Sequence, residues 1–236
     1  MKASILELSI SNPQPRLNER FDILLKAKVL EVEIFGDLAA PEKEIISYKK
    51  GKKLVVKRVS TGNHQLCISK TATHIGKFEA GPLGFELNGT KYTTNKIHYE
   101  VINQLPDVDK GLWIRKIKPD ETSFWIIIEQ RTPAKVVREK KGSAIHVSYE
   151  PKAFPFVSLK HHDIPLTQLK IINGHSSTGL NEGGEYATAD KTKTFAYSYS
   201  ISHFEIVDPT IPIKLIKKNF ENLPEDYDFE DIVISE

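Results

Sequence analysis

Apolar and polar residues alternate at every second position along most of this chain, and that period limits what it can fold into. The clearest run has apolar Phe195, Tyr197, Tyr199 and Ile201 separated by Ala196, Ser198 and Ser200. Successive side chains of a β-strand point to opposite faces, so such a run predicts a strand with one face on a core. No amphipathic helix longer than two turns is indicated. The sequence therefore predicts an all-β protein.

The strand-like runs fall into two sets, one on each side of Leu105-Pro106-Asp107. The first set includes Phe21–Val29, Leu83–Leu87 before Asn88-Gly89, and Ile97–Val101; the second includes Trp113–Ile117, Phe124–Ile128, Ile145–Tyr149, Leu169–Ile172, Phe195–Ile201 and Ile211–Leu215. Short strands with turn signals about every 8–12 residues favour β-sandwiches. We predict two β-sandwich domains, residues 1–106 and 107–218, followed by an acidic C-terminal tail, residues 219–236.

Charge and motif content narrow the classes of function. The 33 Lys and Arg nearly balance the 31 Asp and Glu, which disfavours a nucleic-acid-binding surface. One Cys excludes an internal disulfide and a cysteine-based zinc finger. The HExxH and CxxC metal motifs and the GxSxG nucleophile elbow do not occur. We therefore expect a protein that is not an enzyme and that needs no metal or other cofactor.

The densest charge run is Tyr48–Arg58, which contains Lys49, Lys50, Lys52 and Lys53. One interpretation is a patch that binds an acidic envelope polymer or a lipid headgroup. The other is a solvated hairpin tip with Gly51 at the turn, where lysines protect an edge strand from aggregation.

Trp125 is the aromatic residue of most interest. It shares one strand face with Ile127, whereas Phe124, Ile126 and Ile128 share the other. A Trp on a sheet face can stack on a sugar, although sandwich cores also need aromatic residues. Because both faces are apolar, one of them is expected at an interface, between the domains or with a partner.

The segment His64–Val101 resembles the BatD family of bacterial aerotolerance (oxygen-tolerance) proteins. Gly76, Phe78, Gly89 and Tyr92 hold the family's turn and hairpin positions, and Gly111–Arg115 is similar to its next strand. Leu17–Val29 is similar to its opening strand, with Asn18 where Gly is usual. The second half departs from the family, because Thr122-Ser123-Phe124 stands where the family has Tyr-x-Gly-Glu.

The resemblance implies tandem immunoglobulin-like domains, no catalytic residues, and membrane partners that carry von Willebrand factor A domains. Metal sites in such partners can accept a carboxylate, which the loop acids Asp107, Asp109, Asp120 or Glu121 could supply. It also implies a periplasmic or other extracytoplasmic protein, membrane-anchored at full length. The printed sequence has no signal peptide or membrane helix, so its literal interpretation is cytoplasmic, and the alternative is an excised region. A glycan-binding envelope protein is the alternative function.

Overall fold

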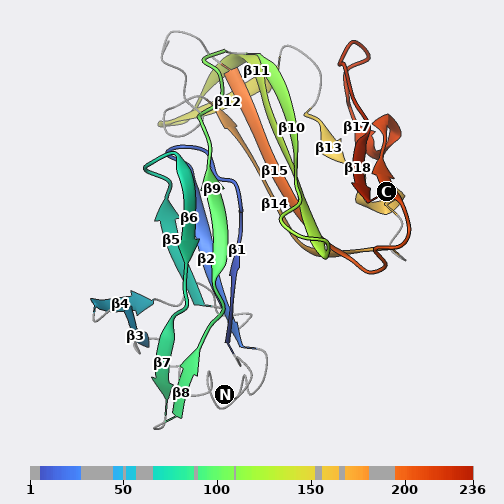
Figure 1. The fold of residues 1–236 in the computed structure, drawn as a ribbon. Coiled ribbons are helices and arrows are strands. Elements are labelled where there is room, and N and C mark those ends of the chain that lie inside the picture. The colour runs from blue at the N-terminus through green and yellow to red at the C-terminus, as the bar shows by residue number, and fades with distance from the viewer. Residues whose placement is uncertain are drawn as a thin grey trace. The chain divides into compact units, whose positions relative to one another are not determined.

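The computed structural model shows a mostly β-strand protein with several antiparallel sheets (Figure 1). The residues it describes are 6–27, 45–49, 52–56, 66–87, 90–108, 110–151, 156–164, 168–180 and 195–235. Within these ranges the only helices are two short 3₁₀ segments, η1 (His161–Asp163) and η2 (Lys217–Asn219). None of the described helices is long and apolar enough to cross a membrane. The all-β class expected from the alternating pattern is confirmed.

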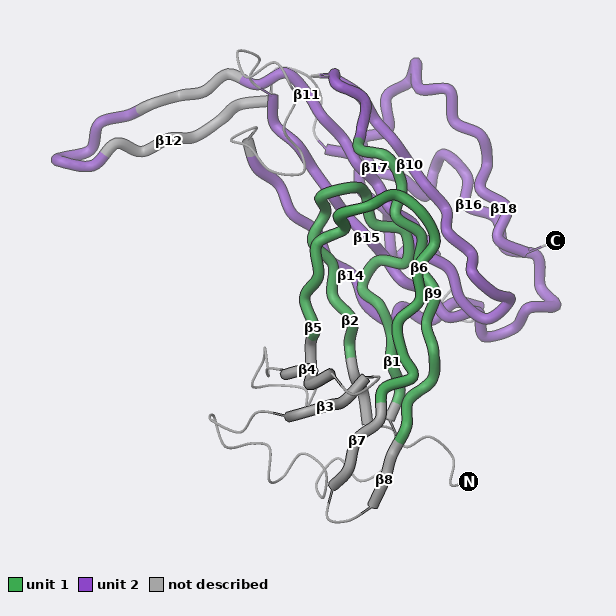
Figure 2. The backbone as a smooth tube through the Cα atoms, turned by 60° about the vertical axis from the view of Figure 1, so that its left-hand side comes forward, with its two compact units in different colours: residues 1–104 green, residues 105–236 purple. Residues whose placement is uncertain are grey.

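The chain divides into two compact units, residues 1–104 and residues 105–236 (Figure 2). Unit 1 contains three sheets among its described residues. Their strand orders are β1 (Leu6–Ile10), β2 (Arg20–Ala27) and β5 (Leu66–Thr71); β6 (Gly76–Ala80) and β9 (Ile97–Val101); and β4 (Lys52–Val56), β3 (Ile45–Lys49), β7 (Gly84–Leu87) and β8 (Thr90–Thr93). The expected hairpin of β7 and β8 is confirmed by the pairing of Leu87 with Thr90. Asn88 and Gly89 lie outside the described residues.

The core of unit 1 forms where the β1–β2–β5 sheet meets the β6–β9 pair. Phe21 and Ile23 of β2 are buried, as their alternation predicts, and Val101 of β9 is buried as well. The Phe21 ring lies 5.1 Å from the Tyr99 ring between centroids, which joins the two layers. Each fully buried aliphatic or aromatic side chain of this kind contributes about 1.5–3 kcal/mol.

Unit 2 is built on a five-stranded antiparallel sheet. Its strands run in the order β10 (Gly111–Ile117), β11 (Ser123–Lys141), β15 (Phe195–Ile206) and β14 (Leu169–Leu180), and β12 (Ala144–Pro151) pairs with the far end of β11. β11 and β15 pair from Ser123 opposite Glu205 to Pro133 opposite Phe195. The segment 181–194, expected as a long hairpin loop, lies outside the described residues.

One face of this sheet carries the main core of unit 2. Phe124, Ile126 and Ile128 lie on it beside Phe204, whose ring centroid is 4.9 Å from that of Phe124. Two small strand pairs cover this face and contribute further buried residues. They are β13 (Ser158–Leu159) with β17 (Phe220–Glu221), and β16 (Ile213–Leu215) with β18 (Ile232–Ser235).

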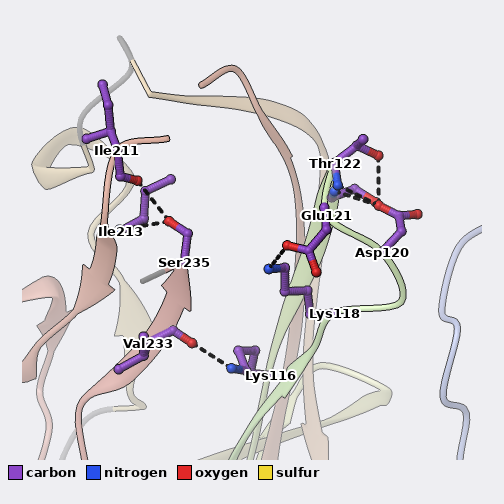
Figure 3. A network of polar contacts seen from close by, with 10 residues as sticks. Lys116, Lys118, Asp120, Glu121, Thr122, Ile211, Ile213, Val233 and Ser235 are labelled. Carbon is purple, nitrogen blue, oxygen red and sulfur yellow. Dashed lines mark hydrogen bonds and ion pairs between the residues drawn. The ribbon is translucent and has the colours of Figure 1, made fainter. Parts of the chain in front are cut away.

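The acidic segment 219–236, expected as a tail, is part of this core as far as residue 235. Phe220 and Ile234 are buried among the core residues, while Asp228 and Glu230 are exposed. The segment is held at the sheet edge because Lys116 Nζ of β10 donates a hydrogen bond to the Val233 carbonyl oxygen, 2.6 Å away (Figure 3). Ser235 Oγ likewise donates to the Ile211 carbonyl oxygen at 2.8 Å (Figure 3). In the sequence, the many acidic residues of this segment therefore mask the few apolar residues that pack into the core.

Candidate functional site

The candidate site is a hollow between the two layers of unit 1, which we name the aromatic groove. It has a volume of about 240 Å³ and is lined by residues 70–74 with Phe21, Phe78, Tyr99 and Val101. Phe78 stacks on Tyr99 with ring centroids 5.5 Å apart, and Tyr99 in turn contacts Phe21. Three aromatic rings therefore form one continuous apolar wall.

Strand pairing places two of the aromatic rings in the groove. Phe78 lies opposite Tyr99 across the β6–β9 pair, so both rings are on the inner face. Gly76 begins β6 with φ +135°, a backbone conformation that side chains rarely adopt, and it follows directly on the exposed Ile75. Phe78, which lines the groove, is 36% exposed, so part of the apolar wall faces solvent.

The polar residues of the lining include one lysine, one histidine and two threonines. Lys70 lies opposite Phe21 in the β2–β5 register, so the sheet places it on the groove side. His74 lines the same hollow, and its Nδ1 lies 2.9 Å from Thr73 Oγ1. None of the residues that line the groove is Asp or Glu. Burial raises the pKa of Tyr99, so its phenol is a neutral hydrogen-bonding group at physiological pH.

The lysine run lies on a hairpin elsewhere in unit 1. Lys49 is opposite Lys52, and Lys53 is opposite Tyr48, in the pairing of β3 with β4. Lys50 and Gly51 lie outside the described residues, as do the side chains of the other three lysines. The hairpin placement fits both interpretations of the run.

The loop acids separate into different settings in unit 2. Asp120 caps the turn between β10 and β11, where its Oδ1 accepts hydrogen bonds from the Thr122 and Ser123 amides at 2.8 and 3.0 Å (Figure 3). Glu121 is 83% exposed at its side chain and pairs with Lys118 (Figure 3). Asp107 is exposed, and Asp109 lies outside the described residues. Asp120 and Glu121 are therefore adjacent on one turn.

Trp125 lies on the second face of the large sheet and is only 7% exposed. The His203 ring stacks on it at 3.8 Å between centroids and 7° between planes. Ile127, Tyr199 and Ile201 complete this second buried cluster. Its indole Nε1 has no hydrogen-bond partner in the described part of the chain. The ring thus has little surface left for stacking on a sugar.

The second face also carries a buried ion pair. Arg115 Nε of β10 lies 3.0 Å from Glu129 Oε2 of β11, and the Glu129 side chain is 1% exposed. Removing one member of such a pair leaves an uncompensated buried charge, so each of the two residues compensates the charge of the other.

Histidine chemistry is limited in the described residues. His161 of η1 is half-buried, with Nε2 3.4 Å from Ser202 Oγ, and burial lowers its pKa. His162 is exposed and lies 3.4 Å from Asp163. The described ranges contain no group of three or more His, Cys, Asp or Glu side chains placed to hold a metal ion.

Sequence reasoning did not find the aromatic groove. Phe21, Lys70, Phe78 and Tyr99 come from four strands, and only their pairing brings them together. The available signal was local, because Ile75 and Phe78 flank Gly76 outside the main alternating runs.

No protein-family model matches this chain, and no curated protein sequence matches it.

Proposed function

We propose that this chain is a non-catalytic protein-interaction module of a bacterial cell-envelope protein resembling the BatD family. The aromatic groove carries this proposal. It combines an apolar wall of three rings with one of these rings, Phe78, exposed to solvent. Exposed apolar surface beside a hollow is typical of sites that bind another molecule.

The backbone supports the proposed family relationship at two positions. Asn18, which stands where the family has Gly, has φ +70°, in the left-handed region that Gly and Asn tolerate best. Gly76, a family turn position, has φ +135°. Both residues therefore meet the backbone requirement that a glycine motif would impose. From the resemblance and the antiparallel sheets of each unit, we propose that the two units are tandem immunoglobulin-like sandwiches.

The proposed partners are membrane proteins with von Willebrand factor A domains, and the proposed location is extracytoplasmic, with a membrane anchor in the full-length protein. The turn that carries Asp120 and Glu121 offers two exposed carboxylates to a metal site of such a partner. The lysine run of β3 and β4 is the proposed contact for an acidic envelope polymer.

Titration calorimetry tests this function directly. The purified chain is titrated with the soluble von Willebrand factor A domain of a membrane protein encoded beside it, and separately with a panel of envelope polysaccharides. We expect saturable one-to-one binding to the domain. Absence of binding to the domain, together with saturable binding to a polysaccharide, would contradict the proposal and favour a glycan-binding protein.

A further inference from the structure

A second hollow lies in unit 2, and we name it the acidic groove. It has a volume of about 520 Å³ and is lined by Ile114 and Lys116 of β10 and by residues 227–233. This volume lies within the range of about 300–1,000 Å³ that is usual for ligand sites. Ile114, Phe229 and Val233 give the lining apolar surface, and Val233 is 38% exposed. The groove is therefore large enough for several side chains of a bound segment.

The main chain beside the acidic groove favours an extended segment. β10 is an edge strand of the large sheet and pairs only with β11 in the part of the chain that the structure describes. On the opposite wall, Asp228, Phe229 and Glu230 make no main-chain hydrogen bond to another described residue. An extended peptide can bind such main-chain groups through hydrogen bonds, while its alternate side chains enter pockets.

The charge of the acidic groove is negative. Three carboxylates line it, those of Asp228, Glu230 and Asp231, against the single ammonium group of Lys116. Lys116 already donates a hydrogen bond to a main-chain carbonyl oxygen of the opposite wall (Figure 3). Asp231 pairs with Lys214 at 2.8 Å, whereas Asp228 and Glu230 have no ion pair among the described residues. A cationic ligand would therefore meet complementary charge, and an anionic one would be repelled.

The spacing of these two carboxylates matches alternate residues of an extended chain. Asp228 and Glu230 are exposed, whereas Phe229 between them packs against Phe220 with ring centroids 5.1 Å apart. The two carboxylates therefore lie on one side of the segment. Residues two positions apart in a strand also share a face, at a spacing of about 6–7 Å. Burial, and then the charge of Asp228, raises the pKa of Tyr227, so its phenol adds no charge to the groove at physiological pH.

We propose that the acidic groove binds an extended, basic segment of a partner protein, which places two alternate Lys or Arg side chains against Asp228 and Glu230. The residue between these two cations points to the opposite face of the segment, toward the apolar lining at Ile114 and Phe229. The surface belongs to unit 2, so the proposal goes beyond the function proposed above. It depends neither on the aromatic groove nor on a von Willebrand factor A domain in the partner.

The test measures fluorescence anisotropy of a labelled, end-blocked peptide in which Lys alternates with Val. A matched peptide has Glu in place of every Lys. The full chain is compared with the double variant Asp228→Asn with Glu230→Gln, which removes both charges and keeps the side-chain lengths. Its matched control is Glu221→Gln with Glu225→Gln, which removes two charges from the same acidic segment outside the groove lining.

A second pair of variants tests the groove wall without removing a carboxylate. Val233→Lys places a positive charge on the wall, where it repels a basic peptide. Val207→Lys is the matched control, because Val207 is an exposed valine of unit 2 that does not line the groove. Thermal unfolding of each variant verifies that a loss of binding is not a loss of folding.

We expect saturable binding of the lysine peptide to the wild-type chain, and binding of the glutamate peptide that is at least about tenfold weaker. The Asp228 and Glu230 double variant and Val233→Lys should each weaken the lysine peptide by about tenfold. Both control variants should bind it with an affinity within about twofold of the wild type.

Three results would overturn the proposal. They are no saturable binding of the lysine peptide, equal binding of both peptides, and an equal loss of affinity in the groove variants and their controls. The last result would mean that the peptide responds to the overall charge of the chain and not to the groove. Failure of the calorimetric titration with a von Willebrand factor A domain leaves this test intact, because the probe is a synthetic peptide.

Discussion

Asp120 and Asp208 build the same turn in two loops of unit 2. In each, Oδ1 accepts hydrogen bonds from the amide and the hydroxyl of the Thr two positions later, at 2.8 and 2.7 Å for Asp120 and at 2.9 and 2.6 Å for Asp208. Burial raises the pKa of Asp120, but the hydrogen bonds from Thr122 and Ser123 together outweigh it and lower the pKa overall. Both hydrogen bonds of Asp208 lower its pKa. Each carboxylate is thus charged and partly committed to its turn.

This pair separates a binding role from a structural one. Asp120→Asn keeps an Oδ1 acceptor for the turn but removes the charge, which the lowered pKa shows to favour the folded state, so we expect a small fall in melting temperature and weaker calorimetric binding to the von Willebrand factor A domain. Asp120→Ala removes the Oδ1 acceptor as well as the charge, so it should lower the free energy of unfolding by about 1 kcal/mol. Asp208→Asn is the control and should bind like the wild type. Equal affinity for Asp120→Asn and the wild type would remove the carboxylate from the interface.

Asn18 tests the backbone argument for the family resemblance. At φ +70° a β-branched residue is strained, so Asn18→Val should lower the free energy of unfolding by about 1–2 kcal/mol. Asn18→Gly should be neutral or slightly stabilising, and Asn103→Val, at an exposed Asn without a positive φ, should cost less. Urea denaturation followed by circular dichroism measures all three. If Asn18→Val and Asn103→Val lowered the free energy of unfolding equally, the left-handed backbone conformation at position 18 would not contribute to stability.

His161 links stability to pH. Burial lowers its pKa in the folded state, so the unfolded chain takes up a proton more readily once the pH falls below about 6.5. Stability should therefore be highest above that value and should fall as the pH drops through the folded pKa. His161→Gln should reduce this fall in melting temperature, whereas the exposed neighbour His162→Gln should retain it. If the melting temperatures of the wild type and of His161→Gln fell equally with decreasing pH, the loss of stability would have another source.

Among the elements, whether the sequence predicts a strand depends on how many of the strand's faces are buried and on how many residues its apolar pattern covers. The sequence predicts β15 because its apolar residues keep a period of two over several positions, and it predicts the first half of β11 from the continuous apolar run Phe124–Ile128. β18 was not predicted, since only Ile232, Val233 and Ile234 interrupt an acidic background. The sequence also does not decide whether Trp125 is buried, because Ile127 makes the strand face of Trp125 as apolar as the opposite face. Period alone does not say which face is covered.

The β18 segment gives a direct test of its place in the core. Ile234 is 3% exposed, so Ile234→Ala should lower the free energy of unfolding by about 2–5 kcal/mol. Val233→Ala is the neighbouring control, because Val233 is 38% exposed and should cost far less. Tryptophan fluorescence during urea denaturation reports on unit 2 specifically, since Trp113 and Trp125 are the two tryptophans of the chain. Equal stability of both variants would mean that the acidic segment is dispensable.

For the whole molecule, the proposed function depends on residues that the fold brings together from distant positions. Phe21, Lys70, Phe78 and Tyr99 line one groove although they lie on four strands. The alternating pattern could predict that Phe21 and Tyr99 point inward, but not that β5 and β6 leave a hollow between them. The lysine run and the loop acids were visible in the sequence because each is contiguous or exposed at a turn.

Hydrogen–deuterium exchange of the full chain, with and without a saturating von Willebrand factor A domain, tests the central claim most directly. The account predicts slower amide exchange in the complex across residues 68–80, which contain β6, the turn before it and the end of β5. Unchanged exchange across this segment, with protection confined to the second unit, would contradict the claim that the groove of unit 1 is the surface for protein binding.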